Sequence, residues 1–113
     1  MADEIKKYLT DVLTSIASIE EFLGATKTYE SYRSNKMLRR AVEREFEIVG
    51  EAMNHALKRD ALLPISSARK IVDLRNKIIH DYDGVDNARM WEIVQIHLPI
   101  LKNEVENLLE EKT

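Results

Sequence analysis

Three side chains that can handle a phosphate and a proton, Arg75, His80 and Tyr82, fall within eight residues of this 113-residue chain. An arginine is always charged, and its planar guanidinium matches the oxygens of a phosphate. A histidine has an ordinary pKa near ~6.5, so it can take and return a proton at neutral pH. The pair suffices for transesterification of an RNA phosphodiester, with His80 taking the 2′-hydroxyl proton and Arg75 stabilising the phosphate charge. This chemistry needs no metal, and we expect neither a metal nor a cofactor.

The spacing of these residues limits how they can work together. Arg75 and His80 are five residues apart, which is about 140° around an ideal helix, whereas Asn76 and His80 share a face. A working site therefore needs the helix to end or distort near His80, or needs a second copy of the motif across a dimer axis. We favour the second arrangement. The plainer alternative is that Arg75 and His80 only satisfy the carbonyls at a helix C-terminus.

The apolar residues recur at helical spacing, so the elements that carry these side chains are predicted to be helices. A first helix ends at Gly24, and a polar stretch over Ala25–Ser34 comes next, either a loop throughout or a loop inside which the next helix begins. The second helix runs from Ser34 or Asn35 to about Lys58, and the third begins after Ser66 or Ser67. A fourth starts near Asn87 and should kink at Pro99. The predicted stripes are Ile5, Leu9, Val12, Ile16, Ile19 and Leu23 in the first helix, and Leu38, Val42, Phe46, Val49, Met53 and Ala56 in the second.

No segment alternates with the period of a β-strand. The fold class is therefore all-α: an antiparallel, up-and-down bundle of four to five helices that forms a single domain over residues 1–113. The long apolar stripes suggest that the bundle also forms a homodimer, through helices near the Arg75–His80 motif.

Composition excludes several classes of protein. The chain has no cysteine, so disulfide frameworks and thiolate metal sites are ruled out. No apolar run approaches the ~18 residues of a membrane span, and the first residues do not resemble a signal peptide. We therefore expect a cytoplasmic protein with no membrane partner. The net charge of −3 requires any nucleic acid to be held by a local site rather than by a basic surface.

Other residues invite a functional interpretation but have a plainer one. Glu43, Glu47 and Glu51 lie one helical turn apart, and we expect them to pair with Arg39, Arg40 and Arg44 or with a partner protein. The histidines His55 and His97 have no second ligand three or four residues further along the chain, which favours structural or exposed histidines over metal ligands. Gly50 inside a helix destabilises it by about 1 kcal/mol relative to alanine, which indicates a close contact with another helix.

The motif and its flanks resemble a known family. Arg75-Asn76, His80 and Tyr82 form the R-x4-H-x-Y pattern of the HepT-like branch of the HEPN superfamily. The block Arg40–Arg44, together with Glu47-Ile48 and Gly50-Glu51-Ala52, is similar to the second-helix signature of that family. Gly84-Val85-Asp86, Trp91 and Leu98-Pro99 match the family's pattern on the C-terminal side of the motif, so the resemblance covers roughly Met37 to Leu109.

The resemblance implies a four- to five-helix bundle that dimerises with its motifs facing one another. It implies a metal-independent endoribonuclease, the toxin of a type VII toxin–antitoxin pair of the HepT/MntA kind. Its antitoxin, an MntA-like minimal nucleotidyltransferase, would transfer AMP to Tyr82. Arg75 and His80 would be catalytic and Asn76 would support them. Two alternatives stay open: a non-catalytic helical adaptor that is the substrate of such a nucleotidyltransferase, and a plain dimerising bundle.

Overall fold

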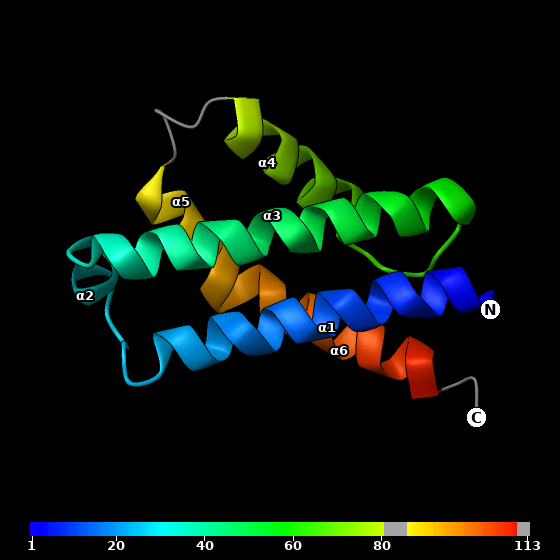
Figure 1. Ribbon diagram of the computed structural model, residues 1–113, viewed down its shortest axis with the longest axis horizontal. Coiled ribbons are helices and arrows are strands. Elements are labelled where there is room, and N and C mark those ends of the chain that lie inside the picture. The colour runs from blue at the N-terminus through cyan, green and yellow to red at the C-terminus, as the bar shows by residue number, and fades with distance from the viewer. Residues whose placement is uncertain (81–85, 111–113) are drawn as a thin grey trace.

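A computed structural model of the chain describes residues 1–80 and 86–110, and the side chains of all of these except Ile79 and His80. Within these ranges every regular element is helical, and Figure 1 shows the helices packed into a bundle. The predicted all-α class is confirmed. In chain order the elements are α1 (Asp3–Leu23), α2 (Tyr29–Arg33), α3 (Lys36–Arg59), α4 (Ala68–His80), α5 (Asn87–Glu92), the π-helical turn η2 (Ile93–His97) and α6 (Leu98–Glu110).

The first predicted helix is α1, and its apolar stripe is buried from Ile5 to Ile19. Gly24 ends it with a φ of 48°, a left-handed conformation that a residue with a side chain rarely adopts. The Gly24 amide donates to the carbonyl of Glu20 at 3.0 Å, which closes the last turn of the helix. The predicted stop is therefore confirmed, together with its physical reason.

The segment predicted as a loop, residues 25–34, contains the short helix α2. Thr28 caps this helix, because its hydroxyl oxygen accepts a hydrogen bond from the amide of Ser31 at 3.2 Å. Tyr32 is fully buried, and its ring packs 5.4 Å from the ring of Trp91. The sequence left open that a helix begins inside this segment, but five residues are too few to show a repeating apolar stripe, so a separate short helix was not predicted.

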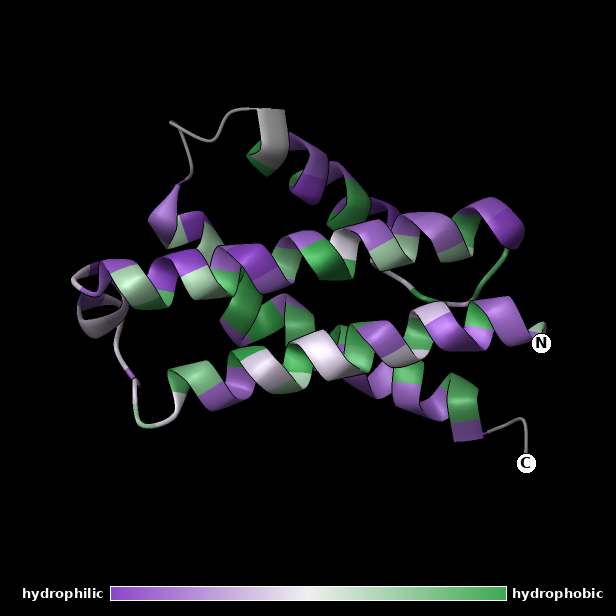
Figure 2. Cartoon of the chain, viewed as in Figure 1, coloured by the Kyte–Doolittle hydropathy of each residue, from purple (hydrophilic) through white to green (hydrophobic). Residues whose placement is uncertain are grey.

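The second predicted helix is α3, and its boundaries agree closely with the prediction. Asn35 is its N-cap, since the Asn35 side-chain oxygen accepts from the amide of Leu38 at 3.0 Å. The helix ends at Arg59, one residue beyond the predicted end. In Figure 1, α3 runs antiparallel to α1 and beside it. Figure 2 shows both helices with apolar and polar residues alternating at the interval of a helical turn.

The last helical region begins as predicted but is less regular. The Asp86 carboxylate caps α5 by accepting from the amide of Arg89 at 3.1 Å. The predicted kink at Pro99 takes the form of the π-helical turn η2, in which the amide of Leu98 donates to the carbonyl of Ile93. Proline has no amide hydrogen and crowds the preceding turn, and a wider turn before Pro99 relieves that crowding.

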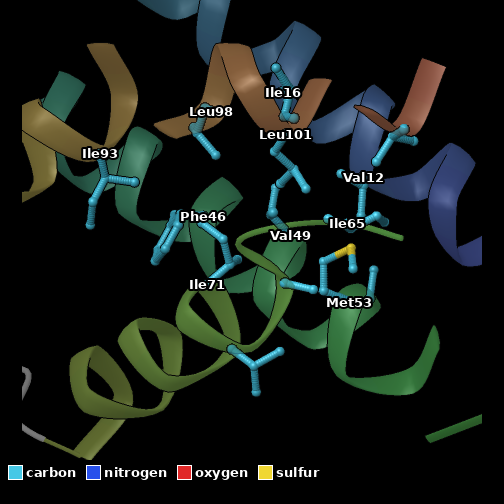
Figure 3. Packing of buried hydrophobic residues seen from close by; sticks show 14 of the residues in the cluster. Val12, Ile16, Phe46, Val49, Met53, Ile65, Ile71, Ile93, Leu98 and Leu101 are labelled. Atoms are coloured by element: carbon cyan, nitrogen blue, oxygen red, sulfur yellow. The ribbon is translucent and has the colours of Figure 1, made fainter. Parts of the chain in front are cut away.

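The core lies between α1, α3, α4 and the η2–α6 region. Figure 3 shows Phe46, Val49 and Met53 of α3 at its centre, with Leu98 and Leu101 of α6 packed above them. In Figure 1, α4 crosses α3 on the side away from α1, so α4 packs against α3. Among the described residues, no helix is long and apolar enough to cross a membrane.

Candidate active site at the crossing of α3 and α4

The crossing of α4 over α3 is centred on Gly50. A Cβ atom placed on Gly50 would lie 2.2 Å from Cβ and 2.4 Å from Cγ of Arg75. Carbon atoms pack at about 3.5–4.0 Å, so no side chain fits at residue 50 while α4 stays in place. The close helix contact predicted from Gly50 is therefore confirmed. The residue that makes this contact is Arg75, one of the predicted catalytic residues.

The guanidinium of Arg75 is held by two neighbours. Its Nη1 donates to Oδ1 of Asn76 at 2.9 Å, and its Nη2 donates to Oε2 of Glu51 at 3.4 Å. The side chain is 20% exposed, and its Nε is buried with no acceptor among the described residues. A buried N–H group without an acceptor is energetically unfavourable, and a bound ligand that accepted a hydrogen bond from it would remove that cost.

Glu51 is the residue that sequence reasoning misassigned. The expected pairs Arg40–Glu43 and Arg44–Glu47 form, with distances of 3.1 and 3.9 Å. Glu51, in contrast, reaches across the crossing to Arg75, and its Oε1 lies 3.7 Å from Nε2 of His55. Gly50 marks the crossing in the sequence, but the next residue points about 100° away around the helix, so nothing in the sequence indicated that Glu51 would reach Arg75.

His55 lies one turn beyond Glu51 and is half-buried. Its ring stacks on the ring of Tyr8 of α1, with centroids 5.0 Å apart and planes at 16°. The interpretation of His55 as a structural histidine agrees with these contacts. In residues 1–80 and 86–110, no three histidine, aspartate or glutamate side chains cluster in a way that would hold a metal ion.

His80 is the last residue of α4, which stays α-helical from Arg75 to this point. The two residues are therefore about 140° apart around one regular helix. Of the two possibilities considered from the sequence for a single copy, the helix ends at His80 and is not distorted before it. The imidazole of His80 lies outside the described side chains, and Tyr82 lies outside the described residues. The structure thus brings Arg75 and Asn76 together, adds Glu51 to them, and does not place the other two groups.

The charge of α4 differs from that of the whole chain. Arg69, Lys70 and Lys77 are exposed on α4 and have no ion-pair partner in the part of the chain that the structure describes. Asp73 is the one acidic residue of this helix, but Asp81, Asp83 and Asp86 follow it in the sequence, so the excess of cations is confined to α4 and the stretch from Arg69 to Asp86 is neutral.

Comparison with known proteins places the chain in a family. A family model described as "Ribonuclease HepT-like" matches residues 12–108, and the chain belongs to the HepT-like ribonuclease family. "Putative RNase MJ1380" of Methanocaldococcus jannaschii is 38% identical over 91% of this chain and 94% of its own length. "Probable ribonuclease HepT" of Thermococcus cleftensis is 37% identical over the same shares of the two chains. No solved structure matches the chain significantly.

Proposed function

We propose that this protein is a metal-independent endoribonuclease whose reaction centre is built around Arg75. The observation that carries the proposal is the partly exposed side chain of Arg75, fixed at a helix crossing that only glycine permits, with a buried Nε that has no acceptor among the described residues. The exposed cations of α4 supply attraction for the neighbouring phosphates of an RNA strand. Relatives that match over nearly their full length carry the name RNase, which supports the same substrate class.

In this reaction the ribose 2′-oxygen attacks the adjacent phosphorus while His80 accepts the hydroxyl proton. Arg75 stabilises the negative charge that builds on the phosphate oxygens, and Asn76 and Glu51 hold the guanidinium in orientation. The bond from phosphorus to the 5′-oxygen breaks, and an imidazolium returns a proton to that leaving oxygen. The products are a 2′,3′-cyclic phosphate and a 5′-hydroxyl end.

We infer that the active form is a homodimer with the two α4 motifs facing each other. A regular helix keeps Arg75 and His80 about 140° apart, so a second copy is the simplest source of a histidine on the correct side of the phosphate. A dimer also provides two imidazoles, one as the base and one as the acid. Mixed dimers test this, in which one subunit is wild-type and the other has both Arg75 and His80 replaced, because each site then lacks a group from one copy. If such dimers keep half of the wild-type activity, each site is built from a single copy, and the inference of a site shared between two copies is wrong.

The same proposal makes the protein the toxin of a HepT/MntA-type toxin–antitoxin pair. A minimal nucleotidyltransferase would link the Tyr82 oxygen to the α-phosphorus of ATP, releasing pyrophosphate. The added AMP brings a bulky base and a negative phosphodiester two residues from His80, and both oppose the binding of an RNA phosphate. Protein incubated with ATP and that partner should gain mass in multiples of AMP, and Tyr82→Phe should abolish the gain.

Purified protein, incubated with RNA in the presence of a chelator, tests the nuclease directly. Arg75→Ala and His80→Ala should each abolish cleavage, whereas Arg69→Ala, at an exposed cation of the same helix, should weaken it only mildly. Equal cleavage by all variants would indicate a contaminating nuclease and refute the proposal.

A second candidate function is a non-catalytic adaptor that docks the nucleotidyltransferase and is its substrate. The observation that favours it is the sequence Asp81-Tyr82-Asp83, which brackets the acceptor tyrosine with two acids that repel phosphate. Gain of AMP on Tyr82 in a protein that cleaves no RNA would select this function.

A further inference from the structure

A cavity of about 260 Å³ opens between α1 and α3, on the other side of Glu51 from Arg75. It is lined by two residues of α1, Tyr8 and Asp11, and by four of α3: Ile48, Glu51, Ala52 and His55. Glu51 borders both this cavity and the guanidinium, because its two oxygens face Arg75 and His55. A nucleotide whose phosphate lies at Arg75 therefore has this cavity next to it.

The walls of the cavity suit a flat ring. The rings of Tyr8 and His55 stack on each other, and both line the cavity together with the apolar side chains of Ile48 and Ala52. Proteins that bind single-stranded RNA splay bases onto aromatic side chains of this kind and hydrogen-bond the Watson–Crick edge. A volume of about 260 Å³ is large enough for one base.

The charges that line the cavity favour the binding of a base over the binding of a phosphate. The carboxylates of Asp11 and Glu51 lie in the lining and repel a phosphate, but they accept hydrogen bonds from amino groups. The cations Lys7 and Arg59 lie over the Tyr8 ring, at 5.8 and 5.0 Å from its centroid, and Arg59 is paired with Glu4 at 3.0 Å. The arrangement thus offers hydrogen-bond acceptors to a base inside the cavity.

We propose that this Tyr8–His55 cavity is the base-recognition subsite of the ribonuclease. It takes a base that carries an amino group on its Watson–Crick edge, namely guanine, adenine or cytosine, and disfavours uracil. Guanine fits best, since its adjacent ring and amino N–H groups can both donate to one carboxylate. This inference rests on the proposed nuclease function, because the reacting phosphate at Arg75 is what brings the base to the cavity.

Two variants separate the subsite from the reaction centre. Tyr8→Leu keeps apolar bulk but removes the aromatic ring that stacks on His55, and Asp11→Asn gives the lining a side chain that can both donate and accept. Glu51 stays intact because it contacts Arg75. Asp3→Asn, an exposed acid at the start of α1, is the matched control for Asp11→Asn.

Cleavage is measured on oligodeoxynucleotides that contain a single ribonucleotide, so that the position of the reacting 2′-hydroxyl is fixed. The base is varied at that position and at its 3′ neighbour. We expect uracil to be cleaved about tenfold more slowly than guanine at one of the two positions. Tyr8→Leu should lower kcat/KM for guanine about tenfold, within the range of one base–aromatic stack. Asp11→Asn should reduce the preference for guanine, and Asp3→Asn should not.

Binding gives a readout that does not require turnover. Titration with guanosine 3′-monophosphate should shift the NMR signals of the Tyr8 and His55 rings, and uridine 3′-monophosphate should shift them less at equal concentration. Cleavage without base preference that neither variant changes would overturn the subsite and leave the nuclease standing. Absence of any RNA cleavage would overturn the nuclease, and unshifted Tyr8 and His55 signals would then overturn the subsite as well.

Discussion

Replacing Gly50 by alanine should separate the effect on activity from the effect on stability. The new methyl group would lie 2.2 Å from Arg75 Cβ, so α4 must move away from α3 by about 1.5 Å to restore a normal carbon contact. Overpacking of this size costs about 1–3 kcal/mol, and the better helix propensity of alanine returns about 1 kcal/mol. The net loss of stability is therefore about 0–2 kcal/mol. The same movement carries the guanidinium away from Glu51, and a misplacement of about 1 Å can lower a reaction rate about 100-fold.

Unfolding in urea, followed by the fluorescence of Trp91, measures the first quantity, and the rate of RNA cleavage measures the second. We expect a folded Gly50→Ala protein that has lost at least 90% of its activity. The control is Ala41→Gly, which changes the same two residue types at a partly buried position of α3 away from the crossing. A Gly50→Ala protein that is about 1 kcal/mol more stable and fully active would refute the reasoning, since it would show that α4 does not press on residue 50.

Three further changes test other parts of the structure. Glu51→Gln should lower the cleavage rate about tenfold, because Glu51 orients the guanidinium of Arg75. The free energy of unfolding should change by less than ~1 kcal/mol, since the Arg75–Glu51 pair is partly exposed. An unchanged cleavage rate would show that Glu51 is not part of the site. Asn35→Ala should destabilise the protein by about 1 kcal/mol in urea, through loss of the α3 cap. Burial, and then the charge of Glu43, raise the pKa of Tyr32 above its ordinary value, so the folded state keeps a proton that the unfolded chain loses above pH ~10. Stability should therefore fall as the pH rises beyond that point, by up to about tenfold in the unfolding equilibrium per pH unit, and Tyr32→Phe should weaken that dependence.

The long helices could be predicted because each one buries a continuous stripe, and because Asn35 and Gly24 mark ends with a known local chemistry. The short helix α2 could not, since its stability comes from Tyr32 packing in the core rather than from any periodicity. The π-helical turn before Pro99 could be predicted only in part. Proline predicts a disturbance, but the form of that disturbance depends on how the flanking turns pack.

The site divides in the same way. The resemblance to a family placed Arg75 and Asn76 in one site, but their hydrogen bond was not predicted, because the helical spacing pairs Asn76 with His80 and side chains of neighbouring residues do not face each other. The role of Glu51 depends on which helix crosses α3 and where, a long-range fact that the sequence expresses only through Gly50. Tyr8 was not predicted at all. It is separated from His55 by nearly half the chain, and one aromatic residue on an amphipathic helix gives no signal of its partner.

The central claim is that a guanidinium and an imidazole, without a metal, cut RNA by attack of the 2′-oxygen. The most direct measurement is mass spectrometry of the ends produced from a single-ribonucleotide substrate in the presence of EDTA. We expect the wild-type protein to leave a 2′,3′-cyclic phosphate end and a 5′-hydroxyl end, and Arg75→Ala to give no product. Products with 5′-phosphate ends, or cleavage that disappears when divalent ions are removed, would contradict it.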